Sequence, residues 1–143
     1  MKKALLPALL LLTLAACKKE ETQPTPAATM QVTGTLSGAN QNPAVTTSAA
    51  GAMTGTYDPN TKVLTYSVTY SGMTPTAGHF HTGAPGTNGP VAITFNSVAT
   101  SPITGTATLT QAQADALTGG SMYANLHTNA NPGGEIRANM VAK

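Results

Sequence analysis

The chain has 143 residues, of which 41% are hydrophobic and 4% aromatic, and it carries seven basic and five acidic side chains. This length is enough for one domain of ordinary size and leaves no room for two. The few basic side chains form no patch that could bind a row of phosphate groups, which argues against nucleic acid as a partner.

Residues 1–16 have the pattern of a signal peptide. Two lysines precede an apolar run over residues 4–14, which is shorter than the about 20 residues that a membrane-spanning helix needs. The run leads through small residues to Cys17, and the sequence Leu-Ala-Ala-Cys resembles the lipobox of bacterial lipoproteins. The resemblance implies cleavage before Cys17 and attachment of lipid to its sulfur. An isolated exported thiol is the alternative.

Cys17 is therefore expected to anchor an exported protein to the bacterial cell envelope, facing the periplasm or the cell surface. It is the only cysteine, so no disulfide bond within the chain is expected. Without the two lysines of the signal, five basic and five acidic side chains remain, and the mature chain has no net side-chain charge. Residues 18–29 are polar and contain two prolines, which predicts that residues 17–29 form a lipidated, flexible tether.

Residues 30–143 are predicted to form one β-domain. Apolar and polar side chains alternate along the sequence with a period of two, which is typical of half-buried strands. The alternating runs are 30–36, 53–57, 64–70, 91–95, 103–109, 122–126 and 136–140. In the fourth run Val91, Ile93 and Phe95 are expected to share one face. Short strands separated by turns predict an all-β fold, either an immunoglobulin-like β-sandwich or a small antiparallel β-barrel.

Two further local signals refine this prediction. Thr110 and Gln113 have the spacing of a capping box, and the alanine-rich residues that follow favour one short helix ending at Gly119. Glycine stands between two threonines at positions 34, 55 and 105. A glycine inside a strand indicates a bend or a close approach of backbones, so we interpret this repeat as architecture rather than chemistry.

The three histidines lie on strand faces that point away from the predicted core. If residues 78–82 are extended, His79 and His81 point to one side and Phe80, the better core residue, points to the other. The same alternation places His127 opposite the apolar residues of its own strand. Two alternatives follow: the histidines are exposed on the surface, or they form a site that the loop 82–90 covers.

Two imidazoles at positions i and i+2 of a strand can bind one metal ion from the same side, and imidazole suits copper and zinc. His127 would complete a set of three nitrogen ligands with His79 and His81. Glu135 could be a fourth ligand or fix the tautomer of a histidine. Arg137 is expected to pair with Glu135 or with a backbone carbonyl. The alternative is a hydrogen-bonded network of the same residues, without a metal, that holds the glycine-rich loop.

Other residues support this site or are set aside. Asn125 falls on the same predicted face as His127 and is expected to support the site together with Arg137. No serine lies in a nucleophile-elbow pattern, Asp58 belongs to a turn, and Asp115 belongs to the helix surface. We therefore assign no catalytic residue.

Three segments of the chain resemble the CHRD domain, which occurs in the animal protein chordin and in many bacterial exported proteins. They are LSGANQNPAVTTSAAGAMTGTYDPNTKVLTYSVTYSGM, GHFHTGAPGTNGPVAI and LTGGSMYANLHTNANPGGEIRANM, and together they cover essentially all of residues 30–142. The chain departs from the family pattern at Gly78 and Ala138. The resemblance implies an all-β domain, immunoglobulin-like or barrel. It also places five residues at signature positions of the family: His79, His81, His127, Glu135 and Arg137.

These patterns favour a lipid-anchored envelope protein whose single domain is a non-catalytic binding or structural module. Copper or zinc could bind to its three histidines. One alternative is a copper- or zinc-dependent enzyme with a site like that of superoxide dismutase, although that enzyme uses more histidines than this chain has. The other is an interaction or adhesion module without a metal, whose threonine-rich strand faces bind an envelope or extracellular protein.

Overall fold

The structure, a computed structural model, describes residues 25–143. The predicted signal peptide 1–16 and the predicted lipidation site Cys17 lie outside the described residues, as does most of the predicted tether. In the part of the tether that is described, the backbone of Ala27 exchanges two hydrogen bonds with the side chain of Asn60, at 3.1 and 2.7 Å. Within residues 25–143, none of the helical segments combines the length and the apolar character needed to cross a membrane.

The described chain is mostly strand, with one short helix. Its elements are β1 (Met30–Ser37), the 3-10 turn η1 (Gly38–Asn40), β2 (Ala50–Asp58), β3 (Val63–Ser71), β4 (Ala77–Thr82), β5 (Val91–Thr94), β6 (Ile103–Thr108), α1 (Gln111–Thr118), β7 (Met122–His127), β8 (Ile136–Asn139) and β9 (Val141–Ala142). All strand pairs are antiparallel.

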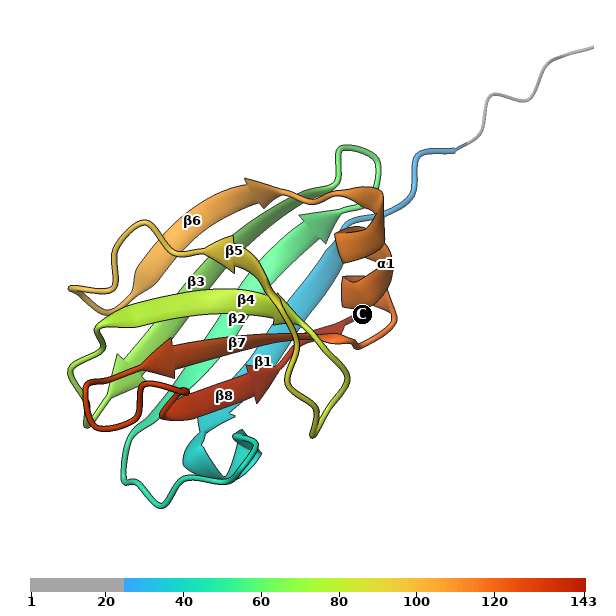
Figure 1. Ribbon diagram of the computed structural model, residues 1–143. Coiled ribbons are helices and arrows are strands. Elements are labelled where there is room, and N and C mark those ends of the chain that lie inside the picture. The colour runs from blue at the N-terminus through green and yellow to red at the C-terminus, as the bar shows by residue number, and fades with distance from the viewer. Residues whose placement is uncertain (1–24) are drawn as a thin grey trace, which may run out of the picture.

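One sheet contains all of these strands, in the order β5-β4-β7-β8-β1-β2-β3-β6, with β9 paired to β1. The sheet folds back on itself, so that β4, β7 and β8 lie across β1, β2 and β3 (Figure 1). The result is a nearly closed, barrel-like antiparallel sheet with one helix. The predicted all-β fold is therefore confirmed, in the second of its two forms.

Apolar side chains from both parts of the sheet fill the space between them. The fully buried ones include Val32, Leu36, Met53, Leu64, Val68, Phe80, Met122, Leu126 and Ile136. Tyr66 of β3 contacts Phe80 of β4 edge to face, with ring centroids 4.9 Å apart, and its ring also stacks on Phe95 at 5.4 Å. Aromatic pairs of this geometry add to the free energy of burial, so these rings connect the two parts of the sheet.

The prediction for the run 91–95 is wrong at one residue. Phe95 is buried, but Val91 is 51% exposed. The pairing of β4 with β5 shifts register between Phe80 and His81, so that Phe80 lies opposite Ile93 whereas His81 lies opposite Val91. A β-bulge of this kind inserts one extra residue and reverses the alternation beyond it. Val91 therefore shares the outward face of His81.

The helix begins and ends as predicted. The Thr110 hydroxyl accepts a hydrogen bond from the backbone of Gln113 at 3.3 Å, and the Gln113 side chain accepts one from the backbone of Thr110 at 2.9 Å. Gly119 follows as the C-terminal cap. Leu117 is fully buried, so the helix covers one end of the barrel core (Figure 1).

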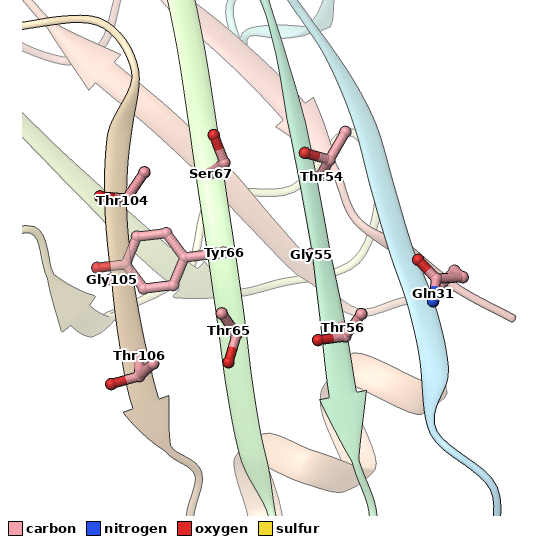
Figure 2. Close-up of a pocket in the computed structure, with 10 residues that line it drawn as sticks. All are labelled: Gln31, Thr54, Gly55, Thr56, Thr65, Tyr66, Ser67, Thr104, Gly105 and Thr106. Carbon is pink, nitrogen blue, oxygen red and sulfur yellow. The ribbon is translucent and has the colours of Figure 1, made fainter.

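The outer side of β1, β2, β3 and β6 carries short polar side chains, and we call it the threonine face. It is formed by Gln31, Thr54, Thr56, Thr65, Ser67, Thr104 and Thr106, which surround a shallow depression of about 680 Å³ (Figure 2). Gly105 lies between two of these threonines, and a Cβ atom built on its backbone would face the core and lie 2.5 Å from the hydroxyl of Tyr66. Glycine is thus required beneath the Tyr66 ring, which supports the architectural interpretation of the repeat.

Candidate metal centre

The outer side of β4, β7 and β8 carries the predicted site residues, and we call it the histidine face. Its members are His79, His81, Tyr123, Asn125, His127, Glu135 and Arg137. The antiparallel register of β4 and β7 places Asn125 opposite His79 and Tyr123 opposite His81, and β8 places Arg137 opposite Asn125. Residues that are far apart in the chain therefore become neighbours on one face.

The loop between β4 and β5 covers this face, as the second of the two alternatives predicted. Arg137 donates hydrogen bonds to the carbonyls of Thr87 and Ala84 at 2.8 and 3.2 Å. The backbone N–H of Gly89 donates to the Tyr123 hydroxyl at 3.1 Å. His81 is only 8% exposed and Arg137 is completely buried. The polar face is thus a second interior, separate from the apolar core.

The three histidines converge, as expected. Nδ1 of His79 lies 3.0 Å from Nε2 of His127, and Nε2 of His81 and Nε2 of His127 each lie 3.0 Å from Oδ1 of Asn125. One nitrogen of each histidine lies within 4.8 Å of the other two. Imidazoles bound tetrahedrally to one zinc ion have their ligating nitrogens about 3.4 Å apart. Small side-chain rotations would therefore bring all three onto a common ion.

Backbone carbonyls select the tautomers of two histidines. Nδ1 of His81 lies 2.9 Å from the carbonyl oxygen of Gly89, and Nδ1 of His127 lies 2.9 Å from that of Pro132. A carbonyl oxygen can only accept, so each Nδ1 carries the hydrogen and each neutral ring presents a lone pair on Nε2. Both lone pairs point at the Asn125 oxygen, which is also an acceptor. Nδ1 of His79 can donate to Nε2 of His127 at 3.0 Å, whereas Nε2 of His81 faces the Asn125 oxygen with a lone pair.

The electrostatic surroundings favour the neutral form of His79 and His127. Burial lowers the pKa of His79, and the neighbouring His127 and His81 lower it further. Burial also lowers the pKa of His127, although the hydrogen bond to the Pro132 carbonyl opposes this shift. Neutral imidazole is the form that binds metal ions. Protons therefore compete for these two rings only at a lower pH than for an exposed histidine.

Glu135 does not join the three histidines. Its carboxylate accepts hydrogen bonds from the hydroxyls of Thr47 and Thr128, at 2.7 and 2.6 Å. These bonds lower the pKa of Glu135. Instead of lying beside the three histidines, as the sequence suggested, the carboxylate connects the segment before β2 to the β7–β8 hairpin. The interpretation of Glu135 as a fourth ligand therefore has no support in the geometry.

Arg137 uses the second of its two predicted partners. It donates to backbone carbonyls of the covering loop rather than to Glu135, and its Nε–H donates to Oδ1 of Asn139 at 3.2 Å. Its guanidinium carbon also lies 3.4 Å from the centroid of the Tyr123 ring. Burial lowers the pKa of Arg137, but a guanidinium stays charged at any physiological pH. The carbonyl oxygens and the aromatic ring offset the cost of burying this charge.

Several residues of the site were not identified from the sequence. The Tyr123 ring stacks on His81, with centroids 4.8 Å apart and planes at 3°. Its place on the same strand face as Asn125 was a usable signal. Gln41 and Thr47 gave none, because they lie on a loop far away in the chain and reach the site only through the fold.

The chain matches the family described as CHRD domain over residues 32–140. The matched range contains all three histidines and the loop that covers them. Comparisons with curated proteins and with solved structures find no significant match.

Proposed function

The chain belongs to the CHRD domain family, and we propose that its domain is a binding module that holds one copper or zinc ion through His79, His81 and His127. One observation carries the proposal. Nε2 of His81 and Nε2 of His127 each lie 3.0 Å from the oxygen of Asn125, and Nδ1 of His79 lies 3.0 Å from Nε2 of His127, so nitrogens of three imidazoles converge at one place. Converging imidazole nitrogens are suitable ligands for a zinc or copper ion.

The supporting geometry suits a metal ion better than a hydrogen-bonded clasp. Carbonyls of Gly89 and Pro132 hold the two rings in the orientation and tautomer that ligating histidines need. Such partners on the second ring nitrogen are the usual companions of histidine ligands. A clasp without a metal would use the same bond from His81 to the Gly89 carbonyl, but it would need an N–H, and not a lone pair, on the ring nitrogen that faces the Asn125 oxygen.

We also propose that the module is attached to the bacterial cell envelope through lipid on Cys17. The support is the sequence of residues 1–17, with its short apolar run and its Leu-Ala-Ala-Cys ending. Replacing Cys17 with serine is expected to move the protein from the membrane fraction to the soluble exported fraction. Retention of the Cys17→Ser variant in the membrane fraction would contradict the anchor.

Calorimetric titration of the purified, metal-free chain with zinc and with copper(II) tests the metal proposal. We expect one equivalent of metal to bind. His81→Gln and His127→Gln should each weaken the affinity by at least about 100-fold, because each removes a ligand. Thr65→Ala, on the threonine face, is the control and should bind as the unchanged chain does.

Two results would overturn the metal proposal. One is that the unchanged chain binds neither ion. The other is that both histidine variants bind a full equivalent with unchanged affinity. A gain in thermal stability on adding metal, lost in the histidine variants alone, gives independent support, because a ligand that binds only the folded state raises its stability.

A further inference from the structure

The side chain of Gln41 has an unusual environment beside the candidate metal centre. It is 8% exposed, and its Nε2 is, within residues 25–143, the one buried side-chain nitrogen or oxygen without a hydrogen-bond partner. A Cβ atom built on Gly134 would lie 2.4 Å from this nitrogen and 2.9 Å from Nδ2 of Asn125. Two amide nitrogens thus lie next to the same point. Both are donors, so neither can satisfy the other.

The other end of the Asn125 amide has the opposite mismatch. Its Oδ1 faces Nε2 of His81 and Nε2 of His127, and both of these are acceptors while Nδ1 of each ring bonds to a carbonyl. Nδ1 of His79 can donate to Nε2 of His127 at 3.0 Å, so the mismatch is greatest at His81. The Asn125 amide therefore turns its acceptor toward acceptors and its donor toward a donor. A buried group arranged in this way is costly unless something else binds there.

A half-turn of the amide would remove both mismatches at once. The oxygen and nitrogen of an amide have nearly the same shape, so they can exchange places without a steric penalty. After the exchange, the two hydrogens on Nδ2 would each meet one histidine lone pair. The oxygen would then take the place of Nδ2 beside Gly134, on the side where Nε2 of Gln41 needs an acceptor. This orientation would suit the metal-free protein, whereas the orientation with the oxygen toward the imidazoles would suit a protein that holds a cation.

We propose that Oδ1 of Asn125 is the fourth ligand of the metal ion and that Gln41 sets the metal affinity by competing for this oxygen. The inference rests on the proposed function. In the empty protein the oxygen accepts from Gln41, and in the loaded protein it binds the ion. Gln41 lowers the affinity without touching the metal, because binding must first break its hydrogen bond.

The donor set would then be three imidazole nitrogens and one amide oxygen. Four protein ligands close a tetrahedral site, which is typical of binding or structural centres rather than catalytic ones. An oxygen ligand and the absence of sulfur from the set favour a divalent ion, zinc or copper(II), over copper(I).

The test compares zinc affinities of the full chain and its variants. Gln41→Met keeps the length of the side chain and removes the donor, so it should tighten zinc binding about five-fold. Gln41→Glu offers an acceptor to Nδ2 and should tighten binding at least as much. Gln111→Met, at an exposed position of α1, is the matched control and should leave the affinity unchanged.

A variant of the proposed ligand Asn125 tests whether the effect of Gln41 depends on the Asn125 amide. Asn125→Asp presents an oxygen to both sides, so it should bind zinc without any half-turn. Adding Gln41→Met to Asn125→Asp should then change the affinity less than two-fold, in contrast to the five-fold change in the unmodified background. Such a difference measures the coupling of the two side chains directly.

A readout independent of affinity is the side-chain amide signal of Asn125 in NMR spectra. In the metal-free chain its NH₂ hydrogens should show hydrogen bonds to imidazole nitrogen, and these should disappear when zinc binds. If the unchanged chain binds zinc and both Gln41 variants bind it with the same affinity as the unchanged chain, the inference is overturned and the metal proposal stands. If the unchanged chain binds neither zinc nor copper, the metal proposal itself is overturned.

Discussion

The threonine face and the histidine face follow from the same sequence pattern but differ in their exposure to solvent. Both consist of polar residues that alternate along the strands with core residues. On the threonine face Thr54, Thr56 and Thr65 are exposed, whereas on the histidine face Asn125 is 3% exposed and Arg137 is completely buried. The alternation of polar and apolar residues therefore predicts which side of a strand faces away from the core, but not whether that side is exposed to water.

The difference follows from the chemistry of the side chains on the two faces. Threonine is short, bonds to water and can stay uncovered. The histidine face instead carries a guanidinium, a carboxylate and three imidazoles. These groups bond to loop carbonyls and hydroxyls and so hold the loops in place over the face. Whether the threonine face binds another protein remains a prediction from the sequence.

The largest effect on stability is expected when Arg137 of the histidine face is replaced. Arg137→Met leaves the carbonyls of Ala84 and Thr87 without their donor inside a covered site. We expect a loss of about 3 kcal/mol in the free energy of unfolding, measured with urea. An equally large loss for Thr65→Met, on the uncovered face, would contradict the difference between the faces.

A second substitution tests the glycines beneath the threonine face. A Cβ atom at Gly55 would lie 2.4 Å from the backbone oxygen of Thr65, so Gly55→Ala forces the strands apart and should cost about 1–3 kcal/mol of stability. Gly133→Ala is the matched control, because a Cβ atom there meets nothing within 4 Å. Equal melting temperatures for the two variants would show that the close approach has no consequence.

The pH dependence of stability should come from the histidine face. The pKa values of His79 and His127 are lowered from 6.5 in the folded chain, so the unfolded state binds protons first as the pH falls. The metal-free protein should keep its full stability above about pH 6.5 and lose it progressively below. In a His79→Gln/His127→Gln variant, unfolding measured from pH 7 to pH 5 should show a flatter profile. A profile as steep as that of the unchanged chain would assign the effect to other groups.

The smallest expected effect is a matched pair of threonine substitutions. Thr47→Val removes one hydrogen bond to Glu135 and should cost about 1 kcal/mol, whereas Thr65→Val should change stability by less than about 0.5 kcal/mol. Thr47→Val should also move the acid-induced loss of stability to higher pH. The bond lowers the pKa of Glu135 from 4.5, and this stabilisation is present above that value and lost below it. Equal effects of the two substitutions in urea would contradict the comparison.

Much of the fold could be predicted from local patterns. The alternation along β1, β2, β3, β6, β7 and β8 identified most of the core, and the spacing of Thr110 and Gln113 identified the helix cap. These signals are legible because strand and helix periodicity place neighbouring side chains on known sides. The strand face of the three histidines was predicted in the same way.

Other features depend on segments that meet only in the folded chain. The bulge beside His81 reverses the direction of Val91, and nothing within the run 91–95 signals it. Gln41 and Thr47 reach the histidine face from a loop before β2, and this contact left Glu135 bonded to threonines rather than placed beside the histidines.

Local sequence patterns were enough to predict the all-β class, the family, and which side chains face away from the core. The burial of one outward face, the meeting of the three histidines and the place of the Asn125 oxygen among them depend on the tertiary structure. The reason is physical: the direction of a side chain is a local property of the backbone. Burial and the pairing of donors with acceptors depend on which distant loops come to lie above it.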